Sequence, residues 1–165
     1  MKILVADYSR TGHTERLAEL IIKGLKSLGH TVVRERIEVE KRRNKWIILA
    51  QQIYTYPFIA LALASSSFRR WWLRHYPQVE EDIRPLSYTD VSGFDCVCIG
   101  GPKWAEISYP VARYLKEIKG LKNKTVGLFG TFGGPPLEVF ELELLFIPMS
   151  DRIEKLGGRV VAALG

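Results

Sequence analysis

Two kinds of hydrophobic pattern alternate along the chain. Residues 2–8 form an almost unbroken apolar run, which is typical of a strand buried on both faces. From His13 to Leu28, leucine and isoleucine recur at the spacing of an amphipathic helix, and Gly29 is a helix-stop signal. The same reasoning predicts strands at residues 31–39, 93–101, 124–130 and 159–164, and helices at 109–118 and 137–158, the last interrupted near Pro148.

Strands that alternate with helices favour an α/β fold with a mostly parallel sheet and helices on both faces. The 165 residues are enough for one domain, residues 1–165, with a core of its own. Ligands of such sheets bind at the carboxyl ends of the strands, where the strand order reverses. With the order 2-1-3-4-5, the loops that follow Tyr8, Gly100 and Gly130 would meet at that edge.

The loop after the first strand, "SRTGHT", has the composition of a phosphate site. It gathers three hydroxyl groups and several backbone N–H groups at the start of a helix, and Gly12 allows close approach of the backbone. It is neither a Walker A loop nor a GxGxxG loop, so nucleoside triphosphates and NAD fit it poorly. The alternative is an ordinary strand-to-helix turn.

Four segments, taken together, resemble the flavodoxin-like family. "YSRTGHT" is similar to its phosphate loop, "FDCVCIGGPKW" to its third strand and flavin-side loop, "YPVARYLKE" to the following helix, and "KTVGLFGTFGG" to its fourth strand and third loop. The resemblance covers roughly residues 1–38 and 92–165. It implies a doubly wound, five-stranded parallel sheet in the order 2-1-3-4-5 and a non-covalently bound FMN.

The resemblance also implies which loop residues contact FMN, and it assigns them in three groups. Around the phosphate it places Ser9, Arg10, Thr11, Gly12, His13 and Thr14; beside the flavin ring Pro102, Lys103, Trp104 and Ala105; and at the polar edge of the ring Thr131, Phe132, Gly133 and Gly134.

Two of these residues suggest specific effects on the flavin. Trp104 would stack on the ring, the alternative being a core tryptophan. Lys103 would place a cation near the flavin and raise its reduction potential. The spacing of the other residues indicates no catalytic side chains and no metal site, so the chemistry would belong to the cofactor. Cys96 and Cys98 are interpreted as buried reduced thiols.

Residues 41–84 form an aromatic-rich insertion between the second and third strands. No charged residue occurs between Trp46 and Phe68, and basic clusters flank this stretch. A single membrane span would separate two parts of one sheet, and Gln51, Gln52 and Pro57 divide the stretch, so two amphipathic helices are expected. A flavodoxin-like chain continues into a helix after its fifth strand, whereas this sequence stops at Gly165. The insertion could cover that sheet face or pack in a homodimer; the alternative is peripheral membrane contact through residues 41–76.

The net charge of +6 and the pI of about 9.4 bear on the choice of partner. Typical flavodoxins are acidic, so a basic chain that resembles them points to an acidic redox partner protein or to a membrane quinone as electron acceptor.

The leading hypothesis for the function is an FMN-dependent electron carrier or a small NAD(P)H- or quinone-linked oxidoreductase. The alternative is a flavin-free interaction module that acts through its insertion. Nucleic-acid binding has only charge in its favour, and the absence of a signal-peptide pattern predicts a cytoplasmic protein.

Overall fold

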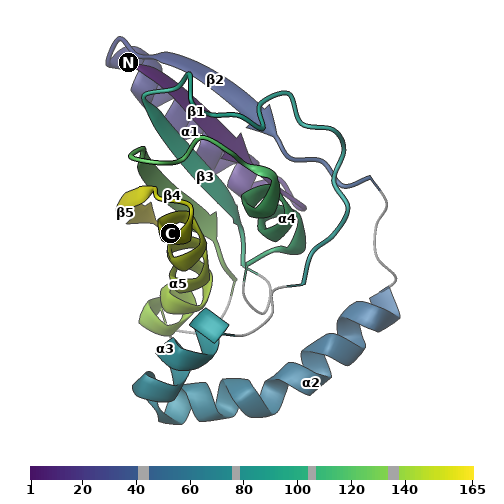
Figure 1. The fold of residues 1–165 in the computed structure, drawn as a ribbon. Coiled ribbons are helices and arrows are strands. Elements are labelled where there is room, and N and C mark those ends of the chain that lie inside the picture. Colours follow the sequence, from purple (N-terminus) through teal and green to yellow (C-terminus); the bar gives the residue numbers. More distant parts are fainter. Residues whose placement is uncertain (41–44, 76–78, 104–106, 134–137) are drawn as a thin grey trace.

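The computed structural model describes residues 1–40, 45–75, 79–103, 107–133 and 138–165, and its centre is a five-stranded parallel sheet (Figure 1). The strand order is β2-β1-β3-β4-β5, as the resemblance implies. The strands are β1 (Lys2–Asp7), β2 (Thr31–Arg36), β3 (Cys96–Pro102), β4 (Thr125–Thr131) and β5 (Arg159–Leu164). The predicted fold class is therefore confirmed.

The helices of the main body lie on both faces of this sheet. They are α1 (His13–Ser27), α4 (Tyr109–Glu117) and α5 (Glu138–Lys155). α1 covers one face, where Ile3, Val5, Ala18 and Phe129 form a small core. α4 and α5 cover the opposite face and enclose the larger core (Figure 1). This larger core includes Leu4, Val97, Val111, Tyr114, Leu128, Leu145 and Met149.

Two predictions about the main body need correction. α5 runs through Pro148 without the predicted interruption. Pro148 has no N–H to donate within the helix, but Leu145 and Met149 pack on the sheet around it and hold the backbone helical. Cys96 and Cys98 are free thiols, yet they are half-buried rather than buried, because α1 covers their part of the sheet incompletely.

The insertion forms two helices, α2 (Lys45–Ala64) and α3 (Ser66–His75). The predicted division at Gln51, Gln52 and Pro57 is wrong, since α2 passes through all three residues and the break falls at Ser65. None of the helices that the structure describes is long and apolar enough to cross a membrane.

The two helices of the insertion pack on α5. A separate hydrophobic cluster joins Ala62, Trp72 and Leu73 of the insertion to Phe140 and Leu144 of α5. The rest of α2 extends past the carboxyl ends of the strands (Figure 1). The described part of the insertion therefore does not provide the expected cover for the last strand, and Val161 and Leu164 of β5 are exposed.

Candidate functional site

Three loops meet where the central strands end. The Tyr8 N–H donates to the Gly100 carbonyl (3.1 Å), which joins the end of β1 to β3. The Lys103 N–H donates to the Thr131 carbonyl (2.8 Å), which joins the segment after β3 to the end of β4. The three loops predicted from the sequence to hold the ligand thus lie side by side.

The first loop presents backbone donors at the start of α1. Its Gly12 N–H donates to the Ser9 hydroxyl (3.0 Å), and Gly12 has a φ of 88°, in the left-handed region that favours glycine. The first bond within the helix runs from the Arg16 N–H to the Gly12 carbonyl, and no side chain caps the helix start. The N–H groups of the first turn are therefore available to an anion, whose charge the helix dipole favours.

A hydroxyl pair links the first loop to the third. The Thr14 and Thr131 hydroxyl oxygens lie 2.7 Å apart, and Thr14 is only 1% exposed. The Thr14 side chain therefore ties the first loop to the third, and its contact with a phosphate stays a prediction.

A cavity of about 580 Å³ opens between the three loops. This volume is typical of small-molecule sites, which span roughly 300–1,000 Å³. Every described residue that lines it belongs to the set predicted from the sequence: Arg10, Thr11, His13, Pro102, Lys103, Thr131, Phe132 and Gly133. The first loop supplies polar groups only, whereas the other two loops supply an aromatic ring and a proline beside Lys103 and Thr131. Trp104, Ala105 and Gly134 lie outside the described residues.

The glycines near the cavity have two different roles. A Cβ on Gly100 would lie 2.2 Å from the Phe129 ring, and one on Gly130 would lie 2.3 Å from Leu145. These two glycines allow close packing beneath the site. By contrast, a Cβ on Gly12 or Gly133 would meet nothing within 4 Å, so these two glycines border open space.

Lys103 is not an isolated cation. Its ammonium group pairs with the Glu141 carboxylate of α5, and the two side chains are only 13% and 12% exposed. Glu141 thus compensates most of the positive charge that the sequence analysis assigned to this position. Sequence reasoning missed Glu141, because a glutamate on a helical stretch gives no sign that it faces a loop distant in sequence.

A second ion pair that sequence reasoning missed lies under the first loop. Asp7 is 1% exposed at the end of β1, and the Arg34 guanidinium donates to both of its carboxylate oxygens (2.7 and 2.9 Å). This bidentate bond raises the pKa of Arg34 above its ordinary value. The pair neutralises a buried carboxylate that would otherwise repel an anion nearby. The one signal in the sequence is an aspartate inside an apolar strand.

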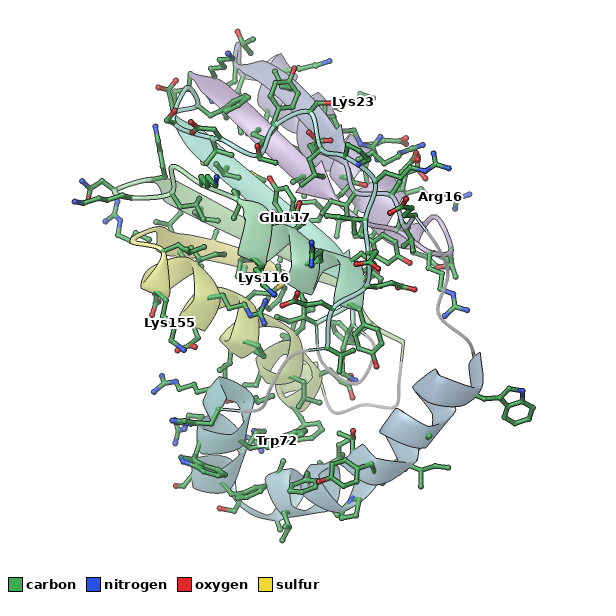
Figure 2. All side chains as sticks on the ribbon, turned by 45° about the vertical axis from the view of Figure 1, so that its right-hand side comes forward. Arg16, Lys23, Trp72, Lys116, Glu117 and Lys155 are labelled. Atoms are coloured by element: carbon green, nitrogen blue, oxygen red, sulfur yellow. The ribbon has the colours of Figure 1, made fainter. Side chains whose placement is uncertain are left out.

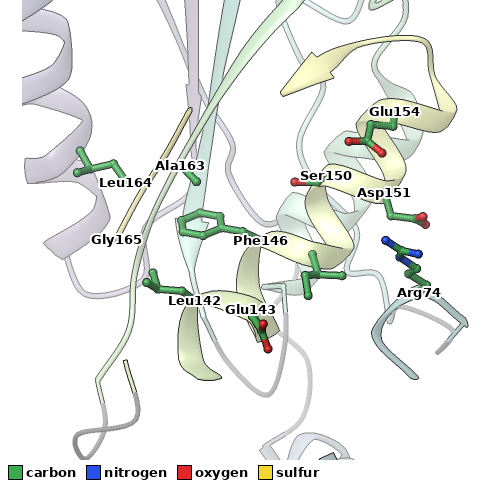
Figure 3. Close-up of a pocket in the computed structure, with 11 residues that line it drawn as sticks. Arg74, Leu142, Glu143, Phe146, Ser150, Asp151, Glu154, Ala163, Leu164 and Gly165 are labelled. Atoms are coloured by element: carbon green, nitrogen blue, oxygen red, sulfur yellow. The ribbon is translucent and has the colours of Figure 1, made fainter. Parts of the chain in front are cut away.

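A larger cavity, of about 780 Å³, lies between α5, the carboxyl end of β5 and Arg74 of α3 (Figure 3). Glu143, Asp151 and Glu154 line its polar side. Carboxylates are poor partners for an anionic ligand, and no described residue of the loops after β1, β3 and β4 lines this cavity. The smaller cavity is therefore the candidate site. Within the part of the chain that the structure describes, no group of histidine, cysteine and carboxylate side chains could hold a metal ion.

Comparison with solved structures finds the same architecture in flavoproteins. A flavoprotein from Lactobacillus acidophilus in complex with FMN matches with a TM-score of 0.63 and 20% sequence identity, over 99% of this chain and 91% of that one. Oxidised flavodoxin 2 from Bacillus cereus matches with a TM-score of 0.55 and 18% identity, over 99% and 84%. General stress protein 14 from Treponema denticola in complex with FMN matches with a TM-score of 0.50 and 11% identity, over 99% and 84%. No family model and no curated protein sequence matches the chain. The likeness establishes the fold that the motifs indicated.

Proposed function

We propose, from the premise that this chain has the flavodoxin-like fold, that it binds FMN at the strand-end cavity and works as a redox protein. One observation carries the proposal. Three separate loops, tied together by the Thr14–Thr131 hydroxyl pair and by backbone hydrogen bonds, line one cavity of suitable size. Solved proteins of the same fold are described as complexes with FMN, which supports the choice of ligand.

The donor set suits a phosphate monoester joined to a flat aromatic ring. Backbone N–H groups of the first turn of α1, the Thr11 hydroxyl, the Arg10 guanidinium and the His13 imidazole would surround the phosphate. Pro102 and Phe132 would lie against the ring, and the open space over Gly133 leaves room for its edge.

Bound FMN would supply the redox chemistry, accepting and releasing one or two electrons. The residues of the chain would bind and orient it and exclude water from one of its faces. The acceptor is either a redox partner protein or a small molecule such as a quinone. The basic charge of the insertion beside the strand ends supports an acidic partner or a membrane-dissolved acceptor.

The direct test is the absorption spectrum of the purified protein, followed by calorimetric titration of the apoprotein with FMN and with riboflavin. We expect about one FMN per chain and much weaker binding of riboflavin, which lacks the phosphate. Equal affinity for the two flavins would contradict the phosphate assignment. Failure to bind either flavin would favour the flavin-free interaction module.

Two threonine variants separate contact with the ligand from support of the site. Thr11→Ala should weaken FMN binding by about 1–3 kcal/mol and leave riboflavin binding unchanged, because only FMN carries the charged acceptor. Thr14→Ala should weaken both flavins, because it releases Thr131 and the third loop. Ser27→Ala, at the far end of α1, is the control for loss of a hydroxyl.

The role of Trp104 stays a prediction. If Trp104 stacks on the flavin, Trp104→Ala should weaken FMN binding by about 1 kcal/mol or more and reduce the quenching of tryptophan fluorescence by the flavin. Unchanged affinity and quenching would place Trp104 away from the ring.

A further inference from the structure

The outward face of α2 is apolar, the reverse of an ordinary surface helix. The exposed side chains at helical spacing along this face are Trp46, Ala50, Ile53, Tyr54, Pro57, Leu61 and Ala64, here called the outer stripe. Trp46 and Tyr54 are each 66% exposed, and Ile53 is 60% exposed. The opposite side of the helix holds Thr55 and Ala62, which are buried. A surface helix that presents such a stripe to water is a sign of an interaction surface.

α3 extends this surface with one aromatic and one basic side chain. Its two adjacent tryptophans differ in burial. Trp72 is buried and points into the angle between the insertion and α5 (Figure 2), whereas Trp71 is 58% exposed. Arg70, next to Trp71, is also exposed. Tryptophan, tyrosine and arginine beside aliphatic side chains are the residues that proteins place at the boundary between lipid headgroups and acyl chains.

The charge of the insertion indicates what kind of partner this surface binds. Residues 41–79 hold 7 of the 24 basic residues of the chain and none of its 18 acidic residues, so 17 basic and 18 acidic residues remain elsewhere. The positive charge of the protein therefore resides in the insertion. A symmetric dimer through the outer stripe would bring two such basic segments together, with no carboxylate of either segment between them. An anionic surface complements the insertion instead.

The position of α2 suits a flat surface. Its 20 residues make a rod of roughly 30 Å, which extends past the carboxyl ends of the strands, on the same side of the molecule as the candidate site (Figure 1). α3 is fixed to α5 by the ion pair between Arg69 and Glu143 and by the cluster around Trp72. A surface that receives the outer stripe would therefore lie near the strand-end cavity.

We propose that the outer stripe and Trp71 dock the protein on an anionic lipid membrane. α2 would lie in the plane of the headgroups with its apolar stripe toward the acyl chains, while the exposed Arg70 of α3 meets lipid phosphates. This docking does not depend on FMN, and it would bring the candidate site close to acceptors dissolved in the membrane.

The test is co-sedimentation of the full chain with vesicles of phosphatidylcholine mixed with phosphatidylglycerol, and with vesicles of phosphatidylcholine alone, at low and high salt. We expect binding to the anionic vesicles that weakens at high salt. Ile53→Glu should lower the partition coefficient about tenfold or more, because it places a carboxylate at the acyl boundary. Leu20→Glu is the matched control, since Leu20 is similarly exposed (67%, against 60% for Ile53) but lies on α1, and it should leave binding unchanged.

A second pair of variants tests the electrostatic part. Arg70→Gln should weaken binding to anionic vesicles about fivefold, as expected for one near-surface charge, with little effect on neutral vesicles. Lys23→Gln removes an exposed charge from α1, far from α2 (Figure 2), and should change neither.

Three outcomes would overturn the proposal. The first is failure to sediment with anionic vesicles at low salt, and the second is equal effects of Ile53→Glu and Leu20→Glu. The third is a dimer in light scattering that Ile53→Glu dissociates, which would assign the outer stripe to a second copy of the chain. None of these outcomes bears on flavin binding, which the titrations test separately.

Discussion

The strand-end site and the insertion lie at the same end of the molecule but are built in opposite ways. At the site, several buried polar side chains have partners from other elements, as in the Thr14–Thr131 and Lys103–Glu141 pairs. In the insertion, apolar side chains face water, and the described contacts with the main body come from α3 and from one side of α2. Polar side chains at the site are thus paired within the fold, whereas the insertion leaves an apolar face exposed to water.

α5 is the element that joins these two regions, and its neighbouring leucines can separate them. Leu145 is buried in the main core, and Leu144 is buried against the insertion. Each substitution by alanine removes a fully buried side chain, which typically costs about 2–5 kcal/mol. Only Leu145→Ala should lower the free energy of global unfolding by this amount, because only Leu145 belongs to the main core.

Denaturant unfolding together with hydrogen exchange measures this largest effect. Leu144→Ala should speed exchange in α2 and α3 while β1 and β3 stay protected. If both variants destabilise the whole chain equally, the insertion and the main body form one cooperative unit, and the proposed contrast between them fails.

The next largest expected loss of stability comes from substitution of a glycine beneath the cavity, compared with a glycine beside it. Gly130→Ala would force its Cβ against Leu145 and against the Gly101 carbonyl oxygen at 2.9 Å, and should cost about 1–3 kcal/mol of stability, as overpacking does. Gly133→Ala is the control, because its Cβ would meet nothing. Thermal unfolding of the two variants tests the comparison. Equal loss of stability would mean that the end of β4 can shift away from α5 at little cost.

Two glutamates on α5 allow the site and the insertion to be perturbed separately. Glu141 pairs with Lys103 at the site, and Glu143 pairs with Arg69 of α3. Glu141→Gln should cost about 1–2 kcal/mol, because it leaves a mostly buried ammonium group without its counter-charge. It should also raise the reduction potential of the bound flavin, because a cation beside the ring is then uncompensated.

Potentiometric titration of both variants with FMN bound measures this effect. Glu143→Gln removes the same charge from the same helix and should leave the potential nearly unchanged. If the two variants shift the potential equally, the effect comes from the overall charge of α5 and not from Lys103.

Hydrophobic periodicity was sufficient to predict the main body. The apolar run at residues 2–8 favours a buried strand, and the helical spacing from His13 onward favours a helix. The places where the strands end follow from the bounds of these elements. The cavity could be anticipated for the same reason, since parallel strands end at a common edge and the loops after β1, β3 and β4 must meet there.

Sequence reasoning failed where the outcome depends on partners distant in sequence. Pro57 and Pro148 read as helix breaks, but in α5 packing on both sides of Pro148 outweighs one lost hydrogen bond. The partners of Lys103 and Asp7 come from other elements and leave no local pattern. The attachment of the insertion to α5 depends on which of two adjacent tryptophans faces inward, which the sequence does not specify.

The smallest predicted effect is a pH dependence of the free energy of unfolding. It arises from a carboxylate of the main body, since residues 41–79 contain no carboxylate. Glu35 of β2 is 6% exposed, and burial raises the pKa of its carboxyl group above the ordinary value of 4.5, although N–H groups of Tyr88 and Ser87 lower it in part. The folded protein therefore holds this proton more tightly than the unfolded chain. The resulting stabilisation is complete below pH 4.5 and is lost as the pH rises through the folded pKa.

Glu35→Gln keeps an acceptor for the Tyr88 N–H and cannot ionise, so its free energy of unfolding should decline less than that of the wild type over this range. Urea unfolding of both proteins at a series of pH values is the measurement, and parallel pH profiles would show that Glu35 ionises in the folded protein without penalty.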